Sequence, residues 1–113
     1  MSSLDKARRE RVRALNDNLR RFHIGGKVLL SSGLAALSSF RLQRVVRAVA
    51  SFNAFSSDND PHEEHDCASL EVEELRIIWK IDYYDQTMTA HSEDEADPAK
   101  TKRVLTIMLA EEY

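Results

Sequence analysis

The chain has 113 residues, of which 42% are hydrophobic and 31% are charged. This length predicts one domain, and the apolar content is too high for an intrinsically disordered chain. No apolar run approaches the roughly 18 residues that cross a membrane, and the N-terminal residues lack the apolar stretch of a signal peptide. The single cysteine, Cys67, excludes an internal disulfide framework and a four-cysteine zinc site. We therefore expect a soluble, cytoplasmic protein that has no membrane partner.

The net charge of −3 is divided unevenly between the two halves of the chain. Residues 1–50 carry eleven basic and three acidic residues, a net charge of +8, whereas residues 51–113 carry five basic and sixteen acidic residues, a net charge of −11. Such halves can attract one another across a fold, or each can serve a partner of opposite charge. In the second case the acidic half could bind a basic protein, and the basic half could bind nucleic acid.

The first predicted element is a helix over residues 3–22. Apolar residues recur there at helical spacing, namely at Val12, Leu15, Leu19 and Phe22. Ser2 or Ser3 can cap its N-terminus, and Gly25-Gly26 offers the left-handed conformation in which helices end. The remaining faces of this helix are rich in arginine, so they are either solvated or available to phosphates.

Three further segments follow the glycines. Residues 27–32 form a short apolar run bounded by Gly33, which predicts a strand. A second helix is predicted over residues 39–55, where Ser38 or Ser39 can cap an apolar stripe made of Leu42, Val45, Val46 and Val49. Residues 56–67 are polar and contain turn-forming residues, so they are predicted to be a loop.

The second half of the chain predicts a hairpin and a last helix. Apolar residues alternate with polar ones from Leu70 to Tyr83, with a turn near Glu73-Glu74. Asp97-Pro98 is a typical cap and first-turn pair for a helix that continues to Leu109. The expected fold is therefore α+β, with a small antiparallel sheet (one short strand plus a hairpin) packed with three helices.

Polar side chains concentrate in the predicted loop and at the end of the second strand of the hairpin. The candidate binding site consists of Asp60, His62, His65, Asp66, Asp82 and Asp85. Imidazole and carboxylate groups are ligands of zinc, manganese and iron, so a divalent metal could activate water there. The weak candidates for its ligands are His62, His65, Asp66 and Asp82. The same residues could instead cap turns and bond to the backbone, with Asp82 paired to a basic neighbour on its strand.

Several motifs resemble those of a known family. They include Ile24-Gly25-Gly26, Asn59-Asp60-Pro61-His62, Glu64-His65-Asp66, Lys80-Ile81-Asp82-Tyr83-Tyr84-Asp85 and the segment from Arg103 to Tyr113. With them the chain resembles a bacterial family designated domain of unknown function 3768. The resemblance implies a single-domain protein encoded on mobile elements as well as chromosomes, often among antirestriction-type accessory genes, and it assigns no activity. Glu63 stands where the family pattern predicts Gly, and Cys67-Ala68 where an aromatic residue followed by Gly is common.

Three functions are compatible with these features. The first is a small non-enzymatic interaction protein without a cofactor, with an accessory or anti-defence role, whose acidic second half binds a basic protein partner. The second is a metal-dependent hydrolase or nuclease-like enzyme that uses the His and Asp residues. The third is nucleic-acid binding through the basic N-terminal helices. Strong salt dependence of protein binding, a bound metal, or a gel shift of duplex DNA would discriminate them.

Overall fold

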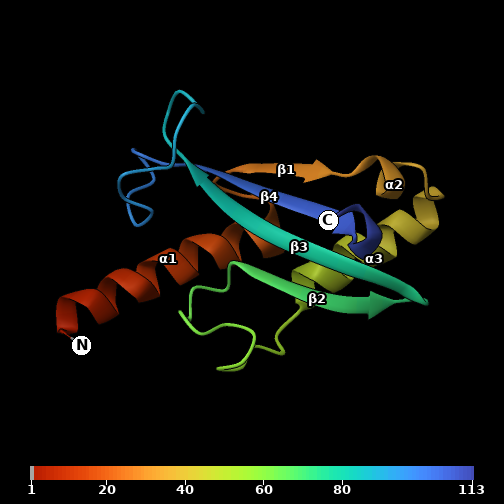
Figure 1. Ribbon diagram of the computed structural model, residues 1–113, viewed down its shortest axis with the longest axis horizontal. Helices are drawn as coiled ribbons and strands as arrows, with labels where there is room; N and C mark the ends of the chain where they lie inside the picture. Colours follow the sequence, from red (N-terminus) through yellow and green to blue (C-terminus); the bar gives the residue numbers. More distant parts are fainter. Residues whose placement is uncertain (1) are drawn as a thin grey trace.

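The computed structural model describes residues 2–113, and Figure 1 shows how its elements are arranged. In chain order these are α1 (Ser3–Phe22), β1 (Lys27–Leu30), α2 (Ser32–Ala35), α3 (Ser39–Ser51), β2 (Cys67–Val72), β3 (Leu75–Tyr84), β4 (Lys102–Leu109) and the 3-10 turn η1 (Ala110–Glu112). The predicted α+β class is confirmed. Among residues 2–113, no helix is long and apolar enough to cross a membrane.

The four strands form one mixed sheet in the order β1-β4-β3-β2. Strand β1 runs parallel to β4, with Lys27 opposite Val104, whereas β2 and β3, and β3 and β4, are antiparallel. The hairpin predicted around Glu73-Glu74 is present as β2 and β3. The sheet differs from the small antiparallel one that was expected, because a fourth strand separates β1 from the hairpin.

That fourth strand is the segment for which the sequence predicted a helix. The apolar residues from Val104 to Leu109 have a spacing that suits one face of a helix or a strand that is buried on both faces. β4 lies between β1 and β3, and seven of its eight consecutive residues are partly or fully buried, with no alternation between buried and exposed positions. Asp97 and Pro98 lie in a turn instead of opening a helix, and the Asp97 carboxylate accepts the backbone N–H of Ala99 (2.9 Å).

One face of the sheet forms the hydrophobic core with the helices. The fully buried apolar side chains are Val12 and Leu19 of α1, Leu34 of α2, Val49 of α3, Ile77 and Trp79 of β3, and Leu105 and Ile107 of β4. In Figure 1, β3 and β4 pass in front of α3, which lies behind them. The opposite side, named here the open face, bears Lys27, Leu29, Lys80, Asp82, Tyr84, Lys102 and Val104. Most of these side chains are half-buried or exposed.

The helix boundaries agree with the prediction at one helix and differ at the other. Helix α1 spans the predicted residues and is capped at its N-terminus by Ser2. Its C-cap is His23, which takes the left-handed conformation (φ 57°) that was expected of the glycines. Phe22, expected to face the core, is 64% exposed. Helix α3 begins as predicted and ends at Ser51, four residues earlier than expected.

Candidate functional site

The candidate residues of the loop between α3 and β2 turn toward helix α1. The His65 side chain lies between two carboxylates, with its Nδ1 2.9 Å from Asp17 Oδ1 and its Nε2 3.6 Å from Asp60 Oδ2. Asp60 is only 5% exposed, and its other carboxylate oxygen accepts the backbone N–H of His65 (3.1 Å). These contacts make Asp60 and His65 a link between the loop and α1.

An aromatic ring and a buried arginine complete this link. The His65 ring stacks on Phe55 with 3.7 Å between centroids and 5° between planes. Arg20 is 2% exposed, contacts Asp17 Oδ1 (3.1 Å) and lies over the rings of Phe55 and Trp79. Because burial disfavours the charged guanidinium, it lowers the pKa of Arg20, and the Asp17 contact opposes that change.

Two other candidate residues line a separate cavity at the end of the hairpin. Asp66 precedes β2, and its carbonyl accepts the backbone N–H of Ile81 (2.7 Å), which brings it beside Asp82 of β3. Both aspartates line a cavity of about 410 Å³ together with Tyr84 and His91. Asp82 is also hydrogen-bonded to Lys80, as the sequence suggested. The loop and the strand end therefore meet at Asp66 and Asp82, whereas Asp60 and His65 face α1.

Two carboxyl groups near this cavity have perturbed acidity. Burial, and then the negative charge of Asp66, raise the pKa of Glu64. Burial also raises the pKa of Asp66, with a further contribution from Asp60. Neither carboxylate is paired with Lys or Arg among residues 2–113. Asp66 lines the cavity without a basic partner, whereas Asp82 is paired with Lys80 and Glu64 lies outside the lining. An unpaired, half-buried carboxylate in a concave site favours a cationic group.

The remaining candidates do not join either group. The carboxylate of Asp85 accepts the Thr87 hydroxyl (2.9 Å) and the backbone N–H of Thr89 (3.1 Å), and these hydrogen bonds lower the pKa of Asp85. Asp85 therefore stabilises a turn. His62 is exposed on the loop. In the part of the chain that the structure describes, no three His, Cys, Asp or Glu side chains are grouped so that they could hold a metal ion.

A buried polar network centred on Asn16 of α1 could not be predicted from the candidate pattern, and Asn16 also donates to the loop at the carbonyl of Glu64 (3.0 Å). Asn16, fully buried, donates to the Tyr83 hydroxyl (2.7 Å) and accepts from Arg103 Nε (2.7 Å). Arg103 is 2% exposed and also donates to the carbonyl of Glu95. Burial raises the pKa of Tyr83 and lowers that of Arg103. The only sequence signal for this network is an asparagine within the apolar stripe of α1.

The basic first half and the acidic second half neutralise one another in part. Arg8 contacts Asp94 (3.3 Å) and Glu95 (2.6 Å). Three more salt bridges join the halves: Arg9 pairs with Glu63, and Arg41 and Arg44 both pair with Glu73. Further arginines of α1, Arg11, Arg13 and Arg20, donate to backbone carbonyls. Most arginines of α1 thus hold the fold together.

Residues 30–112 match the sequence model of a family described as "Protein of unknown function (DUF3768)". The chain belongs to this family. The match extends from the end of β1 to the end of η1, so every candidate site residue lies inside the DUF3768 segment. Helix α1, which supplies Asp17 and Asn16, precedes it. The comparisons with curated proteins and with solved structures find no significant match.

Proposed function

We propose that this DUF3768 protein is a small non-enzymatic binding module, and that it accepts a basic side chain of a protein partner in the cavity lined by Asp66 and Asp82. The observation that carries the proposal is the unpaired negative charge there. Asp66 lines the cavity, and Glu64 lies outside the lining but close enough for the charge of Asp66 to raise its pKa. Both are half-buried, the pKa of each is raised, and neither contacts Lys or Arg among residues 2–113. A guanidinium or ammonium group placed between them would relieve that repulsion.

The walls of the cavity suit the stem of a long basic side chain. Tyr84 and Met88 offer aromatic and apolar surface, which can pack against the methylene groups of Arg or Lys. Asp82 is half-exposed in its contact with Lys80, so an incoming cation can replace that lysine. The cavity therefore combines two carboxylates with apolar walls.

The other acid-base candidates hold the fold together, which favours binding over catalysis. His65 and Asp60 hold the loop to α1, and Asp85 holds a turn. We further propose that the protein acts in the cytoplasm, because the sequence predicts neither a signal peptide nor a membrane span. The family resemblance supports an accessory or anti-defence role for a mobile element.

The binding proposal is tested with a hexa-arginine peptide added to the isotope-labelled protein. We expect amide NMR shifts at Asp66, Asp82 and Tyr84, and an affinity that falls steeply between about 20 mM and about 200 mM salt. The double variant Glu64→Gln/Asp66→Asn should bind roughly tenfold more weakly.

The matched control is Glu74→Gln/Glu111→Gln, which removes the same charge from two exposed sites elsewhere. It should keep the affinity within about twofold, because distant exposed charges are screened. Equal losses in both double variants, or binding that does not depend on salt, would show that the cavity has no specific role.

The metal-dependent alternative is tested by thermal unfolding. We expect the same Tm in EDTA and after addition of zinc, manganese or magnesium, since the candidate ligands are dispersed. A metal present at a hundred times its dissociation constant would add roughly 2.7 kcal/mol, which is several degrees in Tm. Such a rise, lost in Asp82→Ala, would overturn the non-enzymatic proposal.

A further inference from the structure

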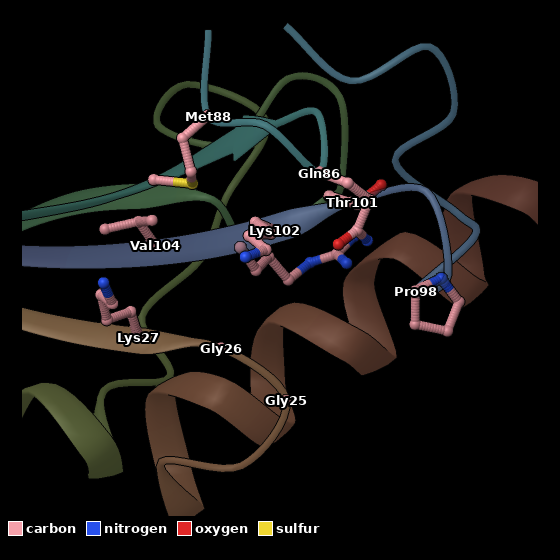
Figure 2. Close-up of a pocket in the computed structure, with 10 residues that line it drawn as sticks. Gly25, Gly26, Lys27, Gln86, Met88, Pro98, Thr101, Lys102 and Val104 are labelled. Atoms are coloured by element: carbon pink, nitrogen blue, oxygen red, sulfur yellow. The ribbon is translucent and has the colours of Figure 1, made fainter. Parts of the chain in front are cut away.

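A second cavity lies on the open face beside the one lined by Asp66, and Met88 lines both. It has a volume of about 350 Å³ and is formed where the turn after α1 meets the beginnings of β1 and β4. Its lining residues are Gly25, Gly26, Lys27, Gln86, Met88, Pro98, Thr101, Lys102, Arg103 and Val104. Figure 2 shows Lys27, Lys102 and Val104 on the adjacent strands, with Met88 facing them from the segment above.

The charge of this cavity is positive, although the chain as a whole is acidic. Lys27 and Lys102 are exposed, and neither pairs with a carboxylate in the described chain, whereas Lys80 and Lys100 do. The lining contains no Asp or Glu. Beneath it, the guanidinium of Arg103 is buried and is held by Asn16 and a backbone carbonyl instead of a carboxylate. Three positive charges therefore meet here without a carboxylate in contact.

The apolar wall of the cavity has no evident role in the fold. Met88 is 40% exposed, and its φ of 62° lies in the left-handed region that favours Gly or Asn. Neither core packing nor backbone preference accounts for a methionine at this position. Beside it, Val104 gives the floor a second apolar surface. A flexible thioether over an apolar floor suits contact with an apolar ligand group.

The floor is held rigid by the Gly25-Gly26 turn. Gly25 has a φ of 86°. A Cβ atom on Gly26 would lie 2.5 Å from the carbonyl oxygen of Arg103, so the chain passes close against β4. The turn therefore fixes Lys27, which follows it directly, next to β4 and opposite Val104.

We propose that this cavity binds a phosphate monoester that carries an aryl or alkyl group. The dianionic phosphate would lie between the ammonium groups of Lys27 and Lys102, and the apolar group would pack against Met88 and Val104. Lysine is a common phosphate-binding residue in proteins, because its ammonium group is a compact positive charge. Two such groups balance the two negative charges of a phosphate monoester. This site adjoins the cavity for a basic side chain, shares Met88 with it, and carries the opposite charge.

The test is a titration of the full chain, in a buffer without phosphate, with phenyl phosphate, inorganic phosphate and phenol. Amide NMR should show saturable shifts at Lys27 and Lys102 with phenyl phosphate. Inorganic phosphate should bind roughly fivefold more weakly and phenol not measurably, because each lacks one half of the ligand. Lys27→Gln and Lys102→Gln should each weaken phenyl phosphate binding by about threefold to tenfold.

Two controls keep the result interpretable. Lys6→Gln removes an exposed lysine of α1 and should leave the affinity unchanged. Lys27→Arg keeps the charge and should retain most of the binding, which separates loss of charge from any local unfolding. Met88→Gln should reduce the preference for phenyl phosphate over inorganic phosphate.

Three results would overturn the proposal. The first is the absence of saturable shifts with phenyl phosphate, and the second is an equal loss in Lys6→Gln. The third is lysine-dependent binding of a single-stranded oligothymidylate by a protein that does not bind phenyl phosphate, which would make the cavity part of a nucleic-acid surface.

Discussion

Individual residues in this protein accept unfavourable backbone angles where the chain turns. His23, Glu63, His65, Glu73, Glu74 and Met88 all have positive φ without being glycine. Glu63 has a φ of 56° and stands where the resemblance predicts Gly. Its side chain is 63% exposed and makes one contact of 3.5 Å with Arg9, which contributes little. The departure from the family pattern therefore replaces a residue that suits the turn with one that does not.

The variant Glu63→Gly should increase the free energy of unfolding by about 0.5–1 kcal/mol, because glycine takes positive φ without a Cβ clash. Urea unfolding measures the change. Glu63→Ala is the matched control, since it removes the same charge and keeps the Cβ atom, and it should give no gain. If both variants had the same stability, backbone strain at this position would not be the cause.

The raised pKa of Asp66 makes the free energy of unfolding depend on pH. Its pKa is raised above the ordinary value of 3.8, mainly by burial. The folded protein therefore holds this proton to higher pH than the unfolded chain does, so the contribution of Asp66 to stability falls as the pH rises above 3.8. Asp66→Asn should be more stable than the parent protein near pH 7, by about 0.5 kcal/mol, and this advantage should disappear in acid.

The matched comparison for this pH dependence is Asp85→Asn, because hydrogen bonds in its turn lower the pKa of Asp85. A group with a lowered pKa stabilises the fold at neutral pH and loses that contribution as the pH falls. Asp85→Asn should therefore be less stable than the parent near pH 7, with a difference that shrinks in acid. Urea unfolding across the acid range would contradict both assignments if the two variants changed in the same direction.

At the scale of elements, α1, β1 and the hairpin could be predicted because local signals agree there. The alternation from Leu70 to Tyr83 fits one covered and one open face, and the turn at Glu73-Glu74 follows from the interruption of that pattern. β4 could not be predicted from its own residues. It is a strand because it pairs with β1 on one side and β3 on the other. Its own residues do not show that both neighbours are present.

The end of α3 also depends on a distant side chain. Arg20 Nη1 donates to the carbonyls of Val49 (3.0 Å), Ala50 (3.0 Å) and Phe52 (2.8 Å), where the helix ends. A positive charge at a helix C-terminus satisfies free carbonyls and complements the helix dipole. This contact from α1 accounts for a helix that stops earlier than its apolar pattern suggested.

Replacement of this arginine should therefore be costly. Arg20→Met leaves the three carbonyls without their donor and Asp17 with His65 as its remaining partner, and should lower the free energy of unfolding by about 3 kcal/mol. Arg21→Met changes the exposed neighbour on the same helix and should cost less than about 0.5 kcal/mol. Chemical unfolding of the two variants measures the difference. Similar stabilities would mean that the carbonyls find other donors.

At the scale of the whole molecule, the candidate site shows what a sequence pattern leaves out. The density of His and Asp residues singles out the loop and the strand end as one candidate site. Only the fold separates them, because Asp66 and Asp82 meet at a cavity while His65 is turned to Asp17. The partner of His65 lies on α1, far away in sequence, so no spacing rule could supply it. Lys27 and Lys102 likewise come together only because β1 pairs beside β4.

The opposite charges of the two halves lead to a prediction about salt. Five contacts join arginines of the first half to carboxylates of the second, and all of them involve partly exposed side chains. Exposed pairs contribute little individually and are screened by salt. Raising the salt from about 0.02 M to about 0.5 M NaCl should therefore lower the free energy of unfolding by about 1 kcal/mol.

The double variant Arg8→Gln/Arg44→Gln removes three of the five contacts and should lose most of this salt dependence. Arg21→Gln/Arg47→Gln, which changes the net charge equally at two arginines outside those pairs, should keep it. Chemical unfolding at both salt concentrations gives the four values needed. If the stability rose with salt, repulsion among the acidic residues would outweigh the contacts between the halves. The acidic half would then carry free charge in excess of its internal pairing, as a protein that binds basic partners requires.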